Sequence, residues 1–131
     1  MRTEVFDIHG DQEKAKEIER WWKDRGQRFD IDCFSNAGVM VFDDERPIAA
    51  SWLFLMNAPI CQIGFTCNNP DASVVARGRA TKTALVAIID MAKQAGFKRI
   101  MHLSSDPGLT KVLKKAGFSI LKPHDFCMGR L

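Results

Sequence analysis

The segment from Val74 to Phe118 constrains the fold of this chain more than any other part, because it contains two helix patterns that end alike. Residues 81–95 repeat apolar side chains at spacings of three and four, which is typical of a helix with one buried face. Gly96 follows this pattern and Gly117 follows a second one, each with a phenylalanine after it. Glycine commonly occupies the left-handed position that ends a helix. The segment therefore predicts two helices.

A strand is predicted between these helices. Residues 98–104 (KRIMHLS) have the pattern of a short strand, and Asp106-Pro107 is typical of an N-cap followed by proline in the first helical turn. Asp106 is thus explained most simply as a helix cap. Helix, strand and helix in succession indicate an α/β or α+β fold.

A basic loop is predicted in front of the first of these helices. Residues Arg77 to Lys82 (RGRATK) place three cations and one glycine within six positions. N–H groups at a helix start bind phosphate oxygens, and glycine lets a ligand approach the backbone closely. The sequence predicts an anion-binding loop here, with a solvated helix start as the alternative.

The first half of the chain predicts a helix among several strands. A strand at 4–8 and a helix from an Asp11 cap to about Arg25 are followed by three strands with short turns, at 38–43, 48–56 and 60–66. Such turns favour an antiparallel meander.

Two details of this half concern side chains. Gly64 predicts a β-bulge or a close backbone approach. Trp21 and Trp22 are expected in the core, with an exposed aromatic platform as the alternative. One or two further strands are expected in residues 119–131.

The composition limits size and partners. A chain of 131 residues corresponds to one domain, 1–131, and 46% hydrophobic residues allow a core without disulfides. The net charge of +3 is spread along the chain, which weighs against nucleic acid but suits an anionic small ligand. With no long apolar run and no apolar leader, the expectation is no membrane partner and a cytoplasmic location.

The cysteines do not form a metal-binding pattern. Cys33, Cys61, Cys67 and Cys127 include no CxxC pair, so no metal site is expected. Reduced, buried thiols are the expectation, and a catalytic thiol is the alternative.

The order of the predicted elements resembles the GCN5-related N-acetyltransferase (GNAT) superfamily. Residues 75–80 (VARGRA) keep Gly-x-Ala of the family's acyl-CoA loop, Gln/Arg-x-x-Gly-x-Gly/Ala, and residues 106–118 keep Lys-x-Gly-Phe of a later helix. The resemblance covers about Val39 to Phe118, and the small size is similar to compact members carried by bacteriophages, some of them virion-associated. Val75 departs from the loop motif, and Leu113 stands where many relatives have a tyrosine, a residue this chain lacks.

The resemblance implies an architecture and a cosubstrate. The expected fold is a single GNAT-like domain with a mixed, mostly antiparallel sheet of about six or seven strands, about three helices and a splay between central strands. Acetyl-CoA is the implied cosubstrate, with its pantetheine arm along residues 60–67 and its diphosphate on the N–H groups of 77–82. The implied cofactor-binding residues are Phe65, Thr66, Cys67, Arg77, Gly78, Arg79, Ala80, Thr81 and Lys82.

The resemblance also implies direct attack of a neutral amine, on a small molecule or a protein, on the thioester. His102 is the preferred base because its ordinary pKa is near 6.5, with a core or surface histidine as the alternative. Gln62 stands where relatives often place a glutamate. Ser104 or Ser105 is expected to replace the missing tyrosine as the acid or to hold a water. The acceptor is not readable, and a homodimer stays open because relatives often dimerise.

Two other functions remain open. A GNAT-like scaffold without catalysis would work as an interaction protein, which the missing tyrosine favours. A nucleic-acid binder would use the lysines at 111, 114 and 115, which are otherwise explained as a solvated helix face. The retained glycine and cations of the loop favour the acetyltransferase.

Overall fold

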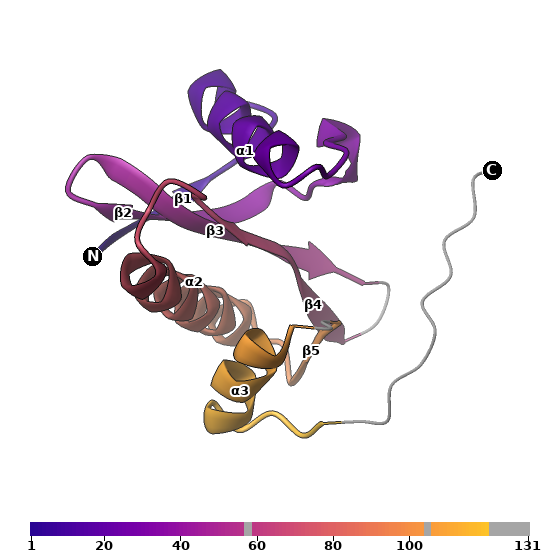
Figure 1. Ribbon diagram of the computed structural model, residues 1–131. Helices are drawn as coiled ribbons and strands as arrows, with labels where there is room; N and C mark the ends of the chain where they lie inside the picture. Colours follow the sequence, from indigo (N-terminus) through magenta and orange to yellow (C-terminus); the bar gives the residue numbers. More distant parts are fainter. Residues whose placement is uncertain (57–58, 104–105, 121–131) are drawn as a thin grey trace.

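A five-stranded sheet with helices on both faces forms the body of the molecule (Figure 1). The computed structural model describes residues 1–56, 59–103 and 106–120. The elements are β1 (Arg2–Phe6), α1 (Gln12–Asp24), a 3-10 turn (Ile31–Cys33), β2 (Ala37–Asp43), β3 (Arg46–Leu55), β4 (Ile60–Asn68), α2 (Val74–Gln94), β5 (Arg99–His102) and α3 (Pro107–Lys115). The predicted mixed fold is confirmed.

The sheet has the strand order β1-β2-β3-β4-β5, the same as the chain order. β2, β3 and β4 form an antiparallel meander, as predicted, and β1 pairs antiparallel with β2 from across α1. β5 pairs parallel with β4 after the crossover through α2. The predicted six or seven strands are too many for the described residues. Residues 119–120 form no strand, and the rest of that predicted segment lies outside the described residues.

The two faces of the sheet are covered by different helices. α1 covers one face, where Ile18 and Trp21 are fully buried against Met40 and Trp52. Asp11 caps this helix by accepting the Lys14 N–H at 3.1 Å, as predicted. The expectation that Trp21 belongs to the core is confirmed.

On the other face, α2 and α3 share a second core. Their apolar side chains pack on those of β4, and this cluster includes Leu85, Ile88 and Leu113. α2 and α3 end at Gly96 and Gly117, whose φ angles of 86° and 96° are left-handed as the sequence predicts.

The predicted loop at Arg77–Lys82 is wrong, because α2 already begins at Val74. Ser73 is its N-cap and accepts the Ala76 N–H at 3.2 Å. Small side chains spaced four residues apart let the first turns of the helix lie close to β2 and β3. They are Ala76, Ala80 and Ala84.

In the described residues no helix is long and apolar enough to cross a membrane. The same residues contain no group of three or more His, Cys, Asp or Glu side chains that could hold a metal ion.

Candidate functional site

β4 and β5 separate part of the way along β4. The two strands pair from Ile60 with Arg99 to Ile63 with His102, where β5 ends, whereas β4 continues to Asn68. In the part of the chain that the structure describes, no strand lies on the β5 side of β4 beyond this point, whereas β3 still pairs with its other side. The predicted splay is therefore present, at the last strand of the described sheet.

The backbone direction at the free end of β4 can be followed from one hydrogen bond. The Asn69 N–H donates to the Ile48 carbonyl at 2.7 Å and so points toward β3. Because backbone groups alternate along a strand, the N–H and C=O of Asn68 point away from β3. The Asn68 carbonyl on this edge already accepts a hydrogen bond from Arg25 at 2.6 Å, so an extended ligand would pair with the outward groups that precede it.

A β-bulge lies just beyond the point of separation. The β3–β4 register shifts between Ala50 and Trp52, and Phe65 has a φ of 52°, which is uncommon for a residue with a side chain. A Cβ added to Gly64 would lie 2.6 Å from the Phe54 ring. The close approach predicted at Gly64 is confirmed, and the bulge turns the backbone where the strands separate.

On the α1 side, the bulge is covered by aromatic rings. Phe65 lies 5.3 Å from Trp22, 4.7 Å from Phe34 and 5.4 Å from Phe54, measured between ring centroids, and it is 36% exposed. We call these four rings the aromatic wall. Trp22 is only partly buried, and its ring packs against Phe65 of the bulge from the α1 side.

The predicted cofactor residues of β4 do not share one environment. The Thr66 and Ser51 hydroxyls share a hydrogen bond of 2.8 Å. Cys67 is buried in the α1-side core, and burial raises the pKa of its thiol to about 12. A thiol with this pKa is not a nucleophile at neutral pH, so the structure gives no support to the alternative of a catalytic Cys67.

The other cysteines are divided between the interior and the surface. Cys61 and Cys67 are buried and Cys33 is exposed, so the expectation of mostly buried thiols agrees with the described cysteines. Cys127 lies outside the described residues.

The predicted diphosphate residues lie in the first turns of α2. The Arg77 N–H donates to the Ser73 carbonyl at 2.9 Å, so the helix already uses this group. The amides of the first helical turn have no partner within the helix. Ala76 already donates its N–H to the Ser73 hydroxyl, which leaves those of Val74 and Val75. Ala80 is fully buried, whereas Gly78, Arg79 and Lys82 are exposed.

Gly78 and Thr81 lie one turn apart on the same side of α2. The Thr81 hydroxyl accepts the Asn68 amide at 3.3 Å, which places this side of the helix next to the free edge of β4. A Cβ on Gly78 would meet nothing within 4 Å. The glycine is therefore not required by the packing of the protein itself.

The opposite side of the α2 start faces acidic residues. A hollow of about 530 Å³ lies between this helix start and the β2–β3 turn. Asp43, Asp44 and Glu45 contribute to its lining. These carboxylates repel phosphate, so an anion at the helix start is favoured on the β4 side.

His102 is the last residue of β5 and not a mid-strand residue as predicted. His102 follows Ile100 by two residues in the strand, so both side chains lie on the same face of the sheet. Ile100 packs on the α2-side core, which places the His102 ring on that face. Both ring nitrogens are buried. This burial lowers the pKa of His102 below its ordinary 6.5, against a smaller, opposite effect of the Leu103 backbone, and keeps the ring neutral at neutral pH.

The proposed acids cannot be placed with equal detail. Ser104 and Ser105 lie outside the described residues. Leu113, which stands at the tyrosine position of the resemblance, is buried in the α2-side core and has no proton to donate.

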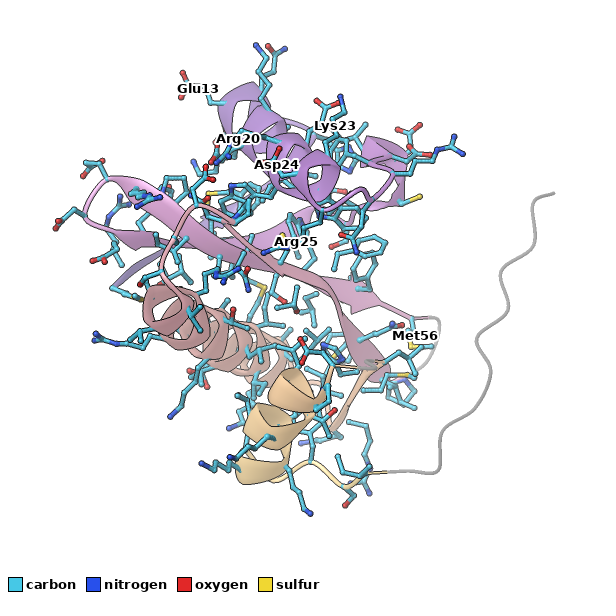
Figure 2. The ribbon with its side chains drawn as sticks, viewed as in Figure 1. Glu13, Arg20, Lys23, Asp24, Arg25 and Met56 are labelled. Carbon is cyan, nitrogen blue, oxygen red and sulfur yellow. The ribbon has the colours of Figure 1, made fainter. Side chains whose placement is uncertain are left out.

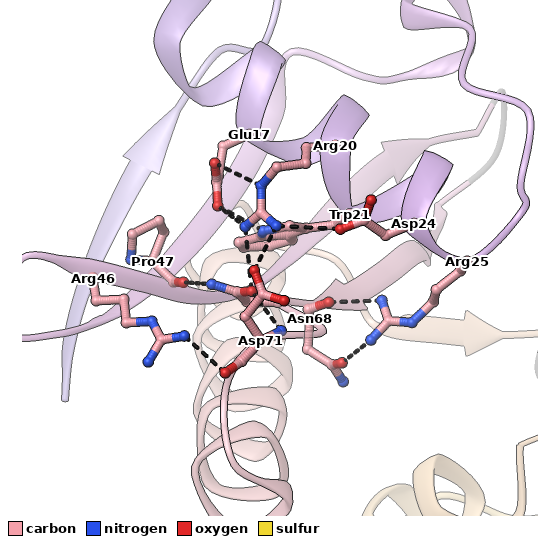
Figure 3. A network of polar contacts seen from close by, with 10 residues as sticks. Glu17, Arg20, Trp21, Asp24, Arg25, Arg46, Pro47, Asn68 and Asp71 are labelled. Atoms are coloured by element: carbon pink, nitrogen blue, oxygen red, sulfur yellow. Dashed lines mark hydrogen bonds and ion pairs between the residues drawn. The ribbon is translucent and has the colours of Figure 1, made fainter.

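Arginines hold the connection between β4 and α2 (Figure 3). Arg20 of α1 donates to Asp71 at 2.7 Å, and Arg46 of β3 donates to the Asp71 carbonyl at 2.8 Å. Arg25, at the end of α1, donates to the Asn68 carbonyl at 2.6 Å and to the oxygen of its side-chain amide. No sequence signal indicated these contacts, since Arg25 and Asn68 are 43 residues apart.

Comparison with known proteins identifies solved structures only, since no protein-family model and no curated protein matches the chain. A crystal structure of a probable acetyltransferase is 12% identical, with a TM-score of 0.71 and coverage of 100% of both chains. A protein of Thermus thermophilus is 17% identical, with a TM-score of 0.67 and coverage of 100% of this chain and 98% of its own.

A Mycobacterium tuberculosis protein in complex with CoA is 7% identical, with a TM-score of 0.73 and coverage of 97% of this chain and 76% of its own. At these identities the likeness establishes the fold.

Proposed function

We propose, from the premise that this chain has the fold of the GNAT superfamily, that it binds acetyl-CoA and transfers the acetyl group to an amine. The observation that carries the proposal is the free edge of β4, which begins beside a bulge and ends next to a helix start. A structural neighbour binds CoA in the same fold. The residues of this chain are arranged to accept the same kind of molecule.

The pantetheine arm is expected along the outward backbone groups of β4, from the bulge to Asn68. Its amides can pair with a strand edge as another strand would. The diphosphate is expected at the first-turn amides of Val74 and Val75 and beside Arg77, on the side away from the acidic hollow. The exposed surface at Gly78 leaves room for it.

The transfer itself needs few protein groups. The amine nitrogen attacks the thioester carbonyl carbon, and the carbonyl oxygen becomes an oxyanion. The C–S bond then breaks, the acetyl group stays on nitrogen, and the CoA sulfur leaves with the bonding electrons. A backbone N–H at the Phe65–Thr66 bulge is the proposed oxyanion donor, because preorganised donors stabilise such charge strongly.

His102 is the proposed acceptor of the proton that the amine loses. It lies where the two strands separate, and its lowered pKa keeps it neutral at neutral pH. Ser104 or Ser105 is proposed to assist the leaving sulfur.

The test is calorimetric titration with acetyl-CoA, followed by the same titration of Gly78→Leu. Leucine at this exposed position meets no protein atom near its Cβ, so the variant should fold while its side chain obstructs the diphosphate. Wild-type binding that Gly78→Leu weakens at least tenfold would support the site. Equal binding by both proteins would place the ligand elsewhere.

A second candidate function is a GNAT-fold interaction protein without catalysis. It is favoured by Leu113, which is buried where many relatives have a tyrosine, and by the helical turn that replaces the predicted loop. Acetyl-CoA that binds but is not consumed in the presence of a panel of amines would favour this function. Absence of any acetyl-CoA binding would favour it more strongly.

A further inference from the structure

We propose that Arg25 is a specificity-determining residue of the cosubstrate site, which binds the phosphates of acyl-CoA from the α1 side. The inference rests on the proposed function, because it adds a contact to the same cosubstrate. It concerns a residue outside the β4–α2 segment to which the diphosphate was assigned.

The position of Arg25 is at the end of the free edge of β4. Its guanidinium donates to the carbonyl and to the side-chain oxygen of Asn68. The amide nitrogen of Asn68 in turn donates to Thr81 of α2. These three residues connect α1 to α2 where an arm lying along β4 has to leave the strand.

The charge of Arg25 is not compensated in the described structure. Arg20, one turn earlier in α1, forms ion pairs with Glu17, Asp24 and Asp71. Arg25 has two neutral oxygens as partners, and no carboxylate of the described residues forms an ion pair with it. It is also exposed, so its charge is available to an anion. Figure 2 shows Arg25 projecting from the end of α1 toward the sheet.

The geometry of the contact fits a phosphate. The two terminal nitrogens of Arg25 already donate to two oxygens of one residue, as a guanidinium does when it binds a phosphate with both nitrogens. A phosphate would add an opposite charge to the same two-nitrogen geometry, which the neutral Asn68 oxygens do not supply. This added attraction is what would favour exchange of the Asn68 oxygens for phosphate oxygens.

The experiment compares acetyl-CoA with S-acetylpantetheine, which has the same thioester and arm but no phosphate. Both are titrated calorimetrically into the wild-type protein and into Arg25→Gln. The expected result is an affinity for acetyl-CoA about tenfold lower in the variant, as for loss of one charge-assisted contact, and an affinity for S-acetylpantetheine that changes less than twofold. The acetyl-CoA affinity should also depend less on salt in the variant.

Two controls separate charge from structure. Lys23→Gln removes an exposed cation two residues away that pairs with Glu19, and it should change neither affinity. Arg25→Lys keeps the charge but not the two-nitrogen geometry, so its acetyl-CoA affinity should fall between those of wild type and Arg25→Gln.

The outcomes distinguish this inference from the proposed function. Equal losses for both ligands would mean that Arg25 only positions β4, and no loss for either would remove it from the site. Both results would overturn the inference and leave the proposed function intact. A wild-type protein that binds neither ligand would overturn both.

Discussion

Replacing Gly78 with alanine tests whether this part of the chain is a helix, as the structure shows, or a loop, as the sequence predicts. Gly78 lies inside α2 and an added Cβ would meet nothing within 4 Å. In a helix interior, glycine is about 0.8–1 kcal/mol less favourable than alanine. We therefore expect Gly78→Ala to stabilise the protein by about 0.5–1 kcal/mol, which corresponds to about 2–5 °C in Tm for a chain of this size.

The measurement is urea and thermal unfolding followed by circular dichroism. Lys82→Ala is the matched control, because it changes an exposed side chain one turn further along α2 and should alter the stability by less than about 0.5 kcal/mol. If Gly78 instead had a left-handed φ in a loop, alanine would destabilise by more than the gain expected from a helix. A lower Tm for Gly78→Ala would thus refute the helical start of α2.

Three further substitutions test the site and its supports. Gly64→Ala should cost about 1–3 kcal/mol, because its Cβ would overlap the Phe54 ring, and adding Phe54→Leu should recover part of the loss in urea unfolding. His102→Leu should abolish acetyl transfer but stabilise the fold by about 1 kcal/mol, since it replaces two buried ring nitrogens with apolar atoms whose burial costs no desolvation. This gain should grow as pH falls below 6.5, where the unfolded imidazole binds a proton that the folded one does not. Glu17→Gln should make the free energy of unfolding less dependent on pH under acidic conditions. Arg20 lowers the pKa of the Glu17 carboxyl, so the stabilisation by the ionised carboxylate is present above pH 4.5 and is lost as the pH falls through the folded pKa.

Each of these has an outcome that would contradict it. A Gly64→Ala protein as stable as wild type would mean that the Phe54 ring does not cover Gly64. Loss of stability in His102→Leu would show that the imidazole has a partner. If the free energy of unfolding of Glu17→Gln depends on acidic pH as that of the wild type does, Arg20 does not stabilise the Glu17 carboxylate.

Much of the fold was predictable because its signals are local. The Asp11 cap, the meander and the left-handed glycines after α2 and α3 each depend on neighbouring residues. The close approach at Gly64 was also predictable, since glycine within a strand pattern commonly marks such a position.

The start of α2 was missed because glycine and three cations in six residues are also typical of a loop. The alanines at 76, 80 and 84 were a usable signal, since small residues spaced by four predict a helix lying close to a sheet. This signal was hidden because Gly78 and the charged residues lie between these alanines, on the exposed side of the same helical turns, and by themselves indicate a loop.

The candidate site was predictable only in part, because it joins residues that are distant along the chain. The pairing of β4 with the strand after α2 follows from the order of the elements, whereas His102 ends that strand and does not lie within it as predicted. The aromatic wall depends on contacts of Phe65 with Phe54, Phe34 and Trp22, which precede it by 11, 31 and 43 positions. The Arg25–Asn68 contact likewise has no local pattern.

The four-residue pairing between β4 and β5 has a consequence for how the molecule assembles. Strands β2, β3 and β4 pair across short turns, whereas β1 reaches β2 only across α1 and β5 reaches β4 only across α2. Local pairings form before those that close long loops, so the three-stranded meander can form early, and β1 and β5 dock afterwards. Hydrogen exchange should accordingly be faster in the β4–β5 pairing than within the meander, and the proposed thioester site is completed after the meander has formed.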